Sequence, residues 1–390
     1  MPWHESDLMS LRKEFVSLAS AEGANMSALC RRFKIARKTG YKWLKRYQQQ
    51  GTEGLCKKSR RPQNSPLQTS EKIEQLVLEL RQEHPVWGGR KLRARLLALG
   101  HKKIPAASTI TAILHRHGRI PPAATESRKH YTRFERSEPN ELWQIDFKGE
   151  FKMSNSQYCY PLTVLDDHSR YAIGLMACVG PRYGVVKEHL ITMFRRYGMP
   201  RALYADNGTP WASAHSPSKH TRLTAWLMRL GVEVIHGRPY HPQGRGKEER
   251  FHRTLKAELL QDRFFDDLCD AQRRFDPFRA MYNQERPHEA LSLDVPASRY
   301  CVSDREYPEM VKEFDYSNRF EVRKANRVGQ FSFKGKQFKT SEAFSGERIG
   351  LSCTPNKNVY EVYYCHFRIG WIDVREKYSR VQSGHPDEMN

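Results

Sequence analysis

Apolar residues recur every three or four positions from Leu8 to Leu18, which predicts an amphipathic helix, and Gly23 follows as a typical stop signal. Shorter patterns of the same period predict two further helices, over residues 27–33 and 36–47. Three short helices of this kind fit a helix-turn-helix domain, and they fit a plain three-helix bundle equally well.

Residues 1–51 are therefore predicted to form an all-α unit whose last helix could read the DNA major groove. The residues expected to point from that helix toward DNA are Arg37, Lys38, Thr39 and Lys42. In a plain bundle the same residues would form only a solvated basic face.

Residues 52–68 contain turn formers and basic residues without apolar periodicity, so we interpret them as a basic linker. Both a solvated tether and a minor-groove arm, with Arg60 and Arg61 on the DNA, fit this composition. Helical periodicity resumes over residues 69–120, a second helix-turn-helix-like unit, and a second basic linker is expected at 121–138.

The hydrophobic period changes after the second linker. Short runs rich in Val, Ile, Tyr and Phe alternate with helical patterns over residues 139–300, which predicts an α/β domain with helices on both faces of a sheet. Three strands precede the first helix, an order that argues against a doubly wound nucleotide-binding sheet. After a linker at 301–318, residues 319–380 return to strands, and a small antiparallel β-barrel is expected there.

The balance of charge adds a class of partner to this outline. The 66 Lys and Arg residues exceed the 44 Asp and Glu residues, which gives a formal net charge of +22 spread along the chain. Such a charge predicts a polyanionic partner, nucleic acid above all, although a ribosome-like or membrane-surface protein can be equally basic. Together with the helix-turn-helix pattern of residues 1–51, this charge favours double-stranded DNA as the partner.

Two kinds of segment are not found in the sequence. No run approaches the roughly 18 apolar residues of a membrane span, and the first residues lack the pattern of a signal peptide.

The eight cysteines are scattered without a C-x-x-C pair, which argues against a zinc site and favours reduced thiols. We therefore expect a cytoplasmic, nucleoid-associated protein without membrane contact.

Two aspartates are associated with predicted strands. Asp146 lies within the apolar run WQIDF, where a charge is costly unless something pairs with it. Asp206 follows the run RALYA, so its side chain would emerge at the carboxyl end of a strand, where the sites of open α/β sheets collect. The tripeptide DNG is also a common turn capped by its own aspartate, and both interpretations of Asp206 stay open.

A helix predicted over residues 246–262 carries two adjacent acids, Glu248 and Glu249. At about 100° per residue, Glu248 projects on the side of the apolar stripe and Glu249 projects nearly opposite. The apolar stripe consists of Phe251, Leu255 and Leu259. Glu249 is therefore predicted to face solvent or a site.

Basic residues surround these acids, and Lys247, Arg253 and Lys256 are expected to contact DNA. An ordinary surface pair between Glu249 and Arg253 is the alternative interpretation of that face. Acids in a strongly basic protein would, however, repel a phosphate unless cations lie between them. Two Mg²⁺ ions about 3.5 to 4 Å apart can be held by carboxylates and can clamp the attacking and leaving oxygens of a phosphoryl transfer.

Four motifs occur in order along the chain: WQIDF at Asp146, LDDHSR from Leu165, DNG at Asp206 and HPQGRGKEERFHRTL from His241. In order and context they resemble the retroviral-integrase-like DDE transposases of bacterial insertion sequences. YNQERPH from Tyr282 resembles the usual end of that family's core, and the helix-turn-helix pair upstream is also similar. The resemblance implies an RNase H-like catalytic core at 139–300.

The same resemblance implies that Asp146, Asp206 and Glu249 are the catalytic, metal-binding triad, with two Mg²⁺ ions for which Mn²⁺ can substitute. The chain departs from the family at two places. Asp206 and Glu249 are separated by 43 residues, more than in many integrases, with WASAHSPSKHTRLT as the apparent surplus. Glu248 also occupies a position that is usually apolar in the family.

The sequence thus predicts a DNA transposase that binds the terminal repeats of its element. It would hydrolyse a phosphodiester to free a 3′-OH and join that hydroxyl to target DNA. A homodimer or higher homo-oligomer is expected, because two element ends must be brought together. A transposase-derived DNA-binding regulator without catalysis and an RNase H-like nuclease without strand transfer are the alternatives.

Overall fold

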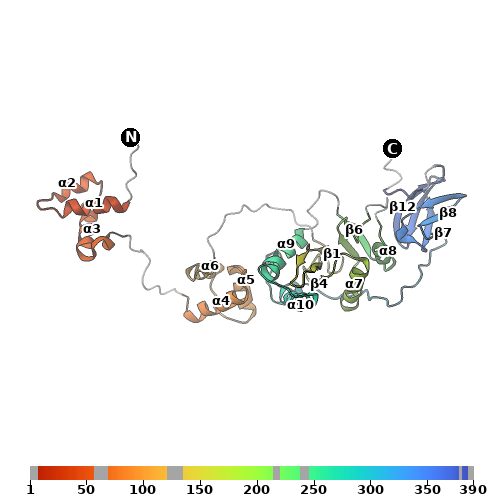
Figure 1. The fold of residues 1–390 in the computed structure, drawn as a ribbon, viewed down its shortest axis with the longest axis horizontal. Helices are drawn as coiled ribbons and strands as arrows, with labels where there is room; N and C mark the ends of the chain where they lie inside the picture. Colours follow the sequence, from red (N-terminus) through yellow and green to blue (C-terminus); the bar gives the residue numbers. More distant parts are fainter. Residues whose placement is uncertain are drawn as a thin grey trace. The chain divides into compact units, whose positions relative to one another are not determined.

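The computed structural model describes residues 8–56, 69–120, 135–213, 220–237, 246–376 and 380–384. The chain divides into two compact units, Met1–Gln68 and Thr69–Asn390, each of which is described by itself (Figure 1). Within the described ranges, no helix has both the length and the apolar character needed to cross a membrane.

The first unit packs three α-helices and a 3₁₀ turn around a small core. Phe15, Cys30 and Leu55 are buried at its centre. A Cβ at Gly40 would come within 2.6 Å of the Cys30 sulfur, so α3 can approach α2 this closely only with glycine there. The elements are α1 (Leu8–Ala19), α2 (Met26–Arg32), α3 (Arg37–Gln50) and the turn Gly51–Leu55.

The buried Leu55 extends this packed unit beyond residue 51. It lies in the segment predicted to be a basic linker. Arg12 on α1 donates a hydrogen bond of 2.7 Å to the Leu55 carbonyl oxygen, which fixes the turn against the first helix. A single apolar residue among turn formers has no periodicity, and the sequence pattern therefore gave no sign of this contact.

The second unit begins with another group of three helices, which contacts the α/β region. Trp87 is fully buried among them, and its indole nitrogen lies 3.4 Å from a carboxylate oxygen of Glu258. Arg95 also pairs with Glu285 at 2.5 Å. These contacts attach the helical group to the α/β region. The helices are α4 (Glu71–Glu83), α5 (Gly89–Ala98) and α6 (Ala107–Arg116).

A six-stranded mixed sheet forms the centre of the α/β region. Its order is β2-β3-β1-β5-β6, and β4 also pairs with β3. β3 is antiparallel to β1, β2 and β4, whereas β5 is parallel to both β1 and β6. The strands are β1 (Leu142–Phe147), β2 (Phe151–Lys152), β3 (Tyr158–Asp166), β4 (Ala172–Cys178), β5 (Ala202–Ala205) and β6 (Glu233–His236).

Helices cover both faces of this sheet, as the sequence predicted (Figure 1). Val164 packs with Phe194 on one face, and its neighbour Leu165 packs with Phe251 on the other, because successive strand residues point to opposite faces. The first face is covered by α7 (Tyr183–Tyr197) and α8 (Arg222–Arg229). The second is covered by α9 (Gly246–Leu255), a π-helical turn (Lys256–Leu260) and α10 (Leu268–Gln284), and two 3₁₀ turns follow at Glu289–Leu291 and Pro296–Ser298.

The connector after the α/β region is anchored by Arg305. Its guanidinium donates hydrogen bonds to the carbonyl oxygens of Pro200, Leu230 and Gly231. Its own carbonyl oxygen accepts a hydrogen bond of 2.7 Å from the Met199 amide. The first part of the segment that we assigned to a linker at 301–318 is therefore bound to the sheet region.

The C-terminal domain consists mostly of strands. A four-stranded sheet has the order β12-β11-β10-β7, and β8 pairs with β9 in a hairpin. Single bridges from Arg380 to Lys339 and from Gln382 to Trp371 connect the hairpin to the larger sheet. The domain also packs on α8 through Met228. The elements are β7 (Glu321–Lys324), β8 (Gln330–Phe333), β9 (Lys336–Lys339), the 3₁₀ turn Glu342–Phe344, β10 (Arg348–Cys353), β11 (Val359–Tyr364) and β12 (Phe367–Asp373).

Replacement of Arg305 by alanine should release the connector. The change leaves three carbonyl groups without their charged donor, so we expect the free energy of unfolding to fall by about 2 kcal/mol. Urea denaturation measures this loss, and chymotrypsin should cut faster at Tyr307. The variant Glu306→Ala, at an exposed neighbouring position, is the control. Equal stability of the two variants would contradict the anchoring role.

Candidate active site

Asp146 lies near the end of β1, and Asp206 directly follows the neighbouring parallel strand β5. In the β1–β5 pair, Leu142 lies opposite Ala202 and Gln144 lies opposite Tyr204. Asp146 lies two residues after Gln144, and Asp206 lies two residues after Tyr204. Adjacent strands are about 4.8 Å apart, so the register brings the two backbone positions together at the carboxyl ends of the strands.

Both aspartates belong to the face of the sheet that α9 covers. Trp143 and Ile145 of β1, like Leu203 and Ala205 of β5, are buried in the core cluster beneath α7 and α8. Strand residues alternate between faces, so Asp146 points to the opposite face, and the same alternation continued by one residue past β5 would direct Asp206 there too. Both side chains are half-buried, which leaves each carboxylate partly accessible.

Short-range hydrogen bonds orient the aspartates. An Asp146 carboxylate oxygen accepts a hydrogen bond of 2.9 Å from the Phe147 amide. An Asp206 carboxylate oxygen accepts one of 3.0 Å from the Gly208 amide, and the Asp206 carbonyl oxygen lies 3.0 Å from His236 Nδ1. The turn interpretation of Asp206 is therefore correct, and it is compatible with a site because the turn holds the carboxyl group at the strand end.

The two adjacent glutamates of α9 have the environments that helical phase predicted. Glu248 is 2% exposed, on the side of the buried Phe251, whereas Glu249 is exposed to solvent. Within the described residues, no three His, Cys, Asp or Glu side chains form a group that could hold a metal ion. The structure therefore confirms the phase of the helix, and the triad of Asp146, Asp206 and Glu249 stays a prediction.

A chain of hydrogen bonds connects α9 to β1 beside Asp146. The Thr163 hydroxyl lies 3.0 Å from the Asp146 carbonyl oxygen, and His252 Nε2 lies 2.8 Å from the same hydroxyl. The hydroxyl donates to the carbonyl, so Nε2 must carry the proton that His252 donates to Thr163. Burial, and then the nearby Lys148 charge, lower the pKa of His252 to about 4. His252 is thus a neutral donor at physiological pH.

Lys247, for which a DNA contact is predicted, pairs with an acid of the protein itself. Its ammonium group lies 2.5 Å from a carboxylate oxygen of the fully buried Asp167, and its side chain is only 13% exposed. Burial, and then the charge of Arg170, lower the pKa of Lys247 to about 8, while Asp167 opposes this shift. By contrast, Arg253 and Lys256 are exposed, as a contact with DNA requires.

The sequence motif LDDHSR forms the turn between β3 and β4. Asp166 accepts hydrogen bonds from the amides of Asn140 and Ser169 at 2.7 Å each. Asp167 accepts one of 2.7 Å from the Gln144 side chain. Both acids therefore help to shape this turn. The contact between Asp167 and Lys247 was missed, because the only sign in the sequence was a second acid after a strand.

The predicted DNA contacts of the first unit lie at the start of α3. Arg37, Lys38 and Lys42 are exposed, and Thr39 is half-buried. Arg60 and Arg61 lie outside the described residues. Trp43, which the sequence pattern did not identify, lies on the same helix, and the Arg12 guanidinium of α1 is 4.1 Å from its ring centre. This cation–π contact joins α1 to α3.

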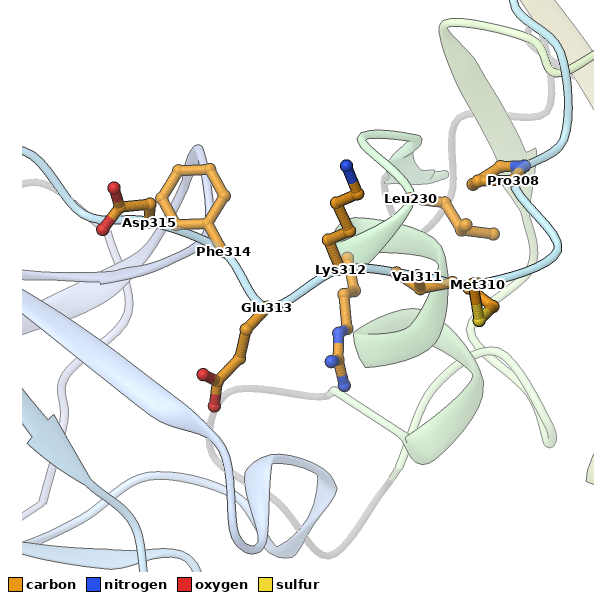
Figure 2. Close-up of a pocket in the computed structure, with 9 residues that line it drawn as sticks. Leu230, Pro308, Met310, Val311, Lys312, Glu313, Phe314 and Asp315 are labelled. Carbon is orange, nitrogen blue, oxygen red and sulfur yellow. The ribbon is translucent and has the colours of Figure 1, made fainter.

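A shallow pocket of about 380 Å³ lies elsewhere, between the end of α8 and the connector (Figure 2). Arg229 and Leu230 line one side, and connector residues from Pro308 to Asp315 line the other. None of the residues that line it belongs to the predicted acidic triad. The candidate active site is therefore the strand ends beside α9 and not this pocket.

Comparisons with family descriptions cover most of the chain. Residues 136–242 and 230–296 match two families described as integrase core domains. Residues 11–63 match a helix-turn-helix domain, and residues 39–114 match a homeodomain-like domain. Residues 320–380 match the C-terminal domain of the IS481 family of transposases.

Two curated relatives come from insertion elements. The uncharacterized 39.2 kDa protein of IS476 from Xanthomonas euvesicatoria is 26% identical over 256 residues, which span 65% of this chain and 71% of that protein. The uncharacterized 31.7 kDa protein of IS407 from Burkholderia multivorans is 29% identical over 159 residues, or 41% of this chain and 54% of that protein.

Among solved structures, the catalytic core domain of HTLV-2 integrase in complex with magnesium is similar over 42% of this chain and 97% of its own. The sequence identity is 14% and the TM-score is 0.33.

The low pKa of His252 should make stability depend on pH. The unfolded state takes up a proton near pH 6.5, and the folded state does so only near 4. The neutral His252 therefore costs no stability above pH 6.5. Below that pH the free energy of unfolding falls by about 1.4 kcal/mol per pH unit, until the pH reaches about 4.

Urea denaturation of the wild type and of His252→Gln between pH 7.5 and 4.5 measures this dependence. Glutamine can donate to Thr163 but cannot titrate, so the difference between the two proteins isolates His252 from other buried histidines such as His220. Parallel pH profiles would show that His252 titrates in the folded protein as it does in the unfolded chain.

Proposed function

We propose that this chain, which belongs to the integrase-core family of insertion-sequence transposases, binds the terminal repeats of its element and catalyses DNA cleavage and strand transfer. The single observation that carries the proposal is the register of β1 and β5, which pairs Gln144 with Tyr204 and, if continued by two residues, brings Asp146 level with Asp206. The exposed Glu249 on α9 supplies the third acid.

We propose Asp146, Asp206 and Glu249 as the residues that hold two Mg²⁺ ions, for which Mn²⁺ can substitute. Carboxylate oxygens are the ligands that these hard cations prefer, and two of the three positions lie at the carboxyl ends of the paired strands β1 and β5. Bound metal would stabilise the charge that develops on the attacking and leaving oxygens. The chain's own contribution is to orient the carboxylates through the Phe147 and Gly208 amides.

The proposed reaction consists of two phosphoryl transfers. In the first, water attacks a phosphodiester at the element end, and the bond to the 3′ oxygen breaks to give a free 3′-OH. In the second, that hydroxyl attacks a target phosphodiester and displaces another 3′ oxygen. Each step forms one P–O bond and breaks one, so neither requires a covalent bond between protein and DNA.

DNA binding is assigned to several basic surfaces. Arg37, Lys38, Thr39 and Lys42 would contact the major groove, and Arg60 and Arg61 would continue along the DNA. Arg253 and Lys256 on the exposed side of α9 and its π-helical turn would hold phosphates next to the acids. We further propose that the C-terminal strands close into a small β-barrel, which the bridges from Arg380 and Gln382 support. Two element ends require at least a homodimer.

Substitutions of the adjacent glutamates test the metal-binding assignment. Glu249→Gln keeps the size of the side chain but removes its charge, so cleavage and joining should fall by orders of magnitude while binding to element ends persists. Glu248→Gln, at the buried position, is the matched control and should have a mild effect. The assay mixes Mg²⁺, the flanking ends of the element and a target plasmid.

The outcomes separate the candidate functions. A dead Glu248→Gln protein beside an active Glu249→Gln protein would overturn the assignment of the acids. Cleavage by the wild type without joined products would indicate a nuclease, and binding without cleavage would indicate a regulator. A covalent protein–DNA adduct would contradict the direct-transfer mechanism.

Removal of the first unit tests the division of labour. A protein that begins at Thr69 lacks Arg37, Lys38 and Lys42 but keeps α4–α6 and their contacts with Glu258 and Glu285. It should lose preference for element ends over unrelated DNA and keep its cooperative unfolding. Competition binding against both DNAs is the measurement, and unchanged preference would show that the first unit does not select the ends.

A further inference from the structure

Asp167 connects three parts of the α/β region from a fully buried position. Its carboxylate accepts hydrogen bonds from the Gln144 side chain at 2.7 Å and from the Arg136 amide at 2.8 Å. The same group pairs with Lys247 at 2.5 Å. The Asp167 amide donates to the Leu142 carbonyl oxygen at 2.9 Å. One side chain therefore joins β1, the β3–β4 turn and α9.

The partners of Asp167 stand next to the predicted metal ligands. Gln144 lies two residues before Asp146 on β1, and the two share one face of the sheet. Lys247 lies two residues before Glu249, in the first turn of α9. A shift of Lys247 would therefore also move Glu249. In the same way, a shift of Gln144 would move Asp146.

Lys247 contacts Asp167 at two atoms. Its ammonium group pairs with the Asp167 carboxylate and donates a second hydrogen bond, 2.9 Å long, to the Asp167 carbonyl oxygen. A buried ion pair adds little net stability, because the loss of hydration offsets the attraction between the charges. Such a pair does fix geometry, since either charge left alone in the interior would be costly.

We propose that the Asp167–Lys247 pair is a positioning device that sets the first turn of α9, so that Glu249 meets Asp146 and Asp206 when metal binds. The proposal rests on the proposed function for the role of the acids. It also gives Lys247 a role other than the expected phosphate contact, because its ammonium group makes two contacts with Asp167. Lys256, which is exposed just after α9, keeps the phosphate-binding role.

Lys247→Met in the full chain is the central test, with Lys256→Met as the matched control. Lys247→Met should speed hydrogen exchange of the α9 amides between residues 247 and 251, measured by mass spectrometry without metal. It should weaken Mn²⁺ binding, followed by electron paramagnetic resonance, by about ten- to a hundredfold, as expected when a group that orients a metal ligand is lost. Lys247→Arg keeps the charge, so its hydrogen exchange and Mn²⁺ affinity should lie between those of the wild type and those of Lys247→Met.

DNA binding distinguishes positioning from direct contact. Lys247→Met should leave the affinity for element ends and its salt dependence near those of the wild type. Lys256→Met should lower the affinity and flatten the salt slope by about one unit, with Mn²⁺ binding unchanged. If Lys247→Met instead flattens the salt slope and leaves exchange and Mn²⁺ binding unchanged, the residue is a phosphate contact and the proposal is wrong.

A double variant and a strand-transfer assay complete the experiment. If Lys247→Met does not fold, the double variant Asp167→Asn/Lys247→Met removes the uncompensated buried charge and undergoes the same measurements. Unaltered exchange and Mn²⁺ binding in that variant would overturn the proposal. Strand transfer by the wild type is recorded in parallel. Its absence would count against the proposed function, whereas the exchange of α9 still tests the positioning role.

Discussion

The pairing register of β1 with β5 is the constraint on which the candidate active site depends. Residues on the two strands are matched at an offset of sixty positions, and a slip by one residue would turn one aspartate to the opposite face of the sheet. Packing on the face covered by α7 and α8 stabilises this register. Four strand residues are buried there in one core cluster: Trp143, Ile145, Leu203 and Ala205. Packing on one face of the sheet thus fixes the chemistry on the other.

Much of this arrangement follows from short-range patterns in the sequence. The alternation of strand residues and the phase of α9 correctly indicated the sheet, its covering helices and the different exposure of Glu248 and Glu249. These features depend on periods of two and 3.6 residues, which are visible within a window of ten positions. The helical pattern of the first fifty residues was equally local.

Contacts between distant polar groups could not be predicted in this way. Lys247 and Asp167 are separated by 80 positions, and neither sequence motif indicates that the two residues pair. Arg305 binds carbonyl oxygens, which every residue possesses, and therefore has no sequence signature. Charged residues of α9 consequently looked alike in the sequence, although Glu249 is exposed and Lys247 lies inside an ion pair.

The anchoring of the connector has a practical consequence for work with the isolated integrase core. A fragment cut at residue 300, the predicted end of the core, would lose Arg305 and would leave the carbonyl oxygens of Pro200, Leu230 and Gly231 without their donor. It would also uncover the apolar surface on which Tyr307 packs. A fragment intended for crystallisation or spectroscopy should therefore extend through Tyr307, so that its boundary follows the packing and not the motif.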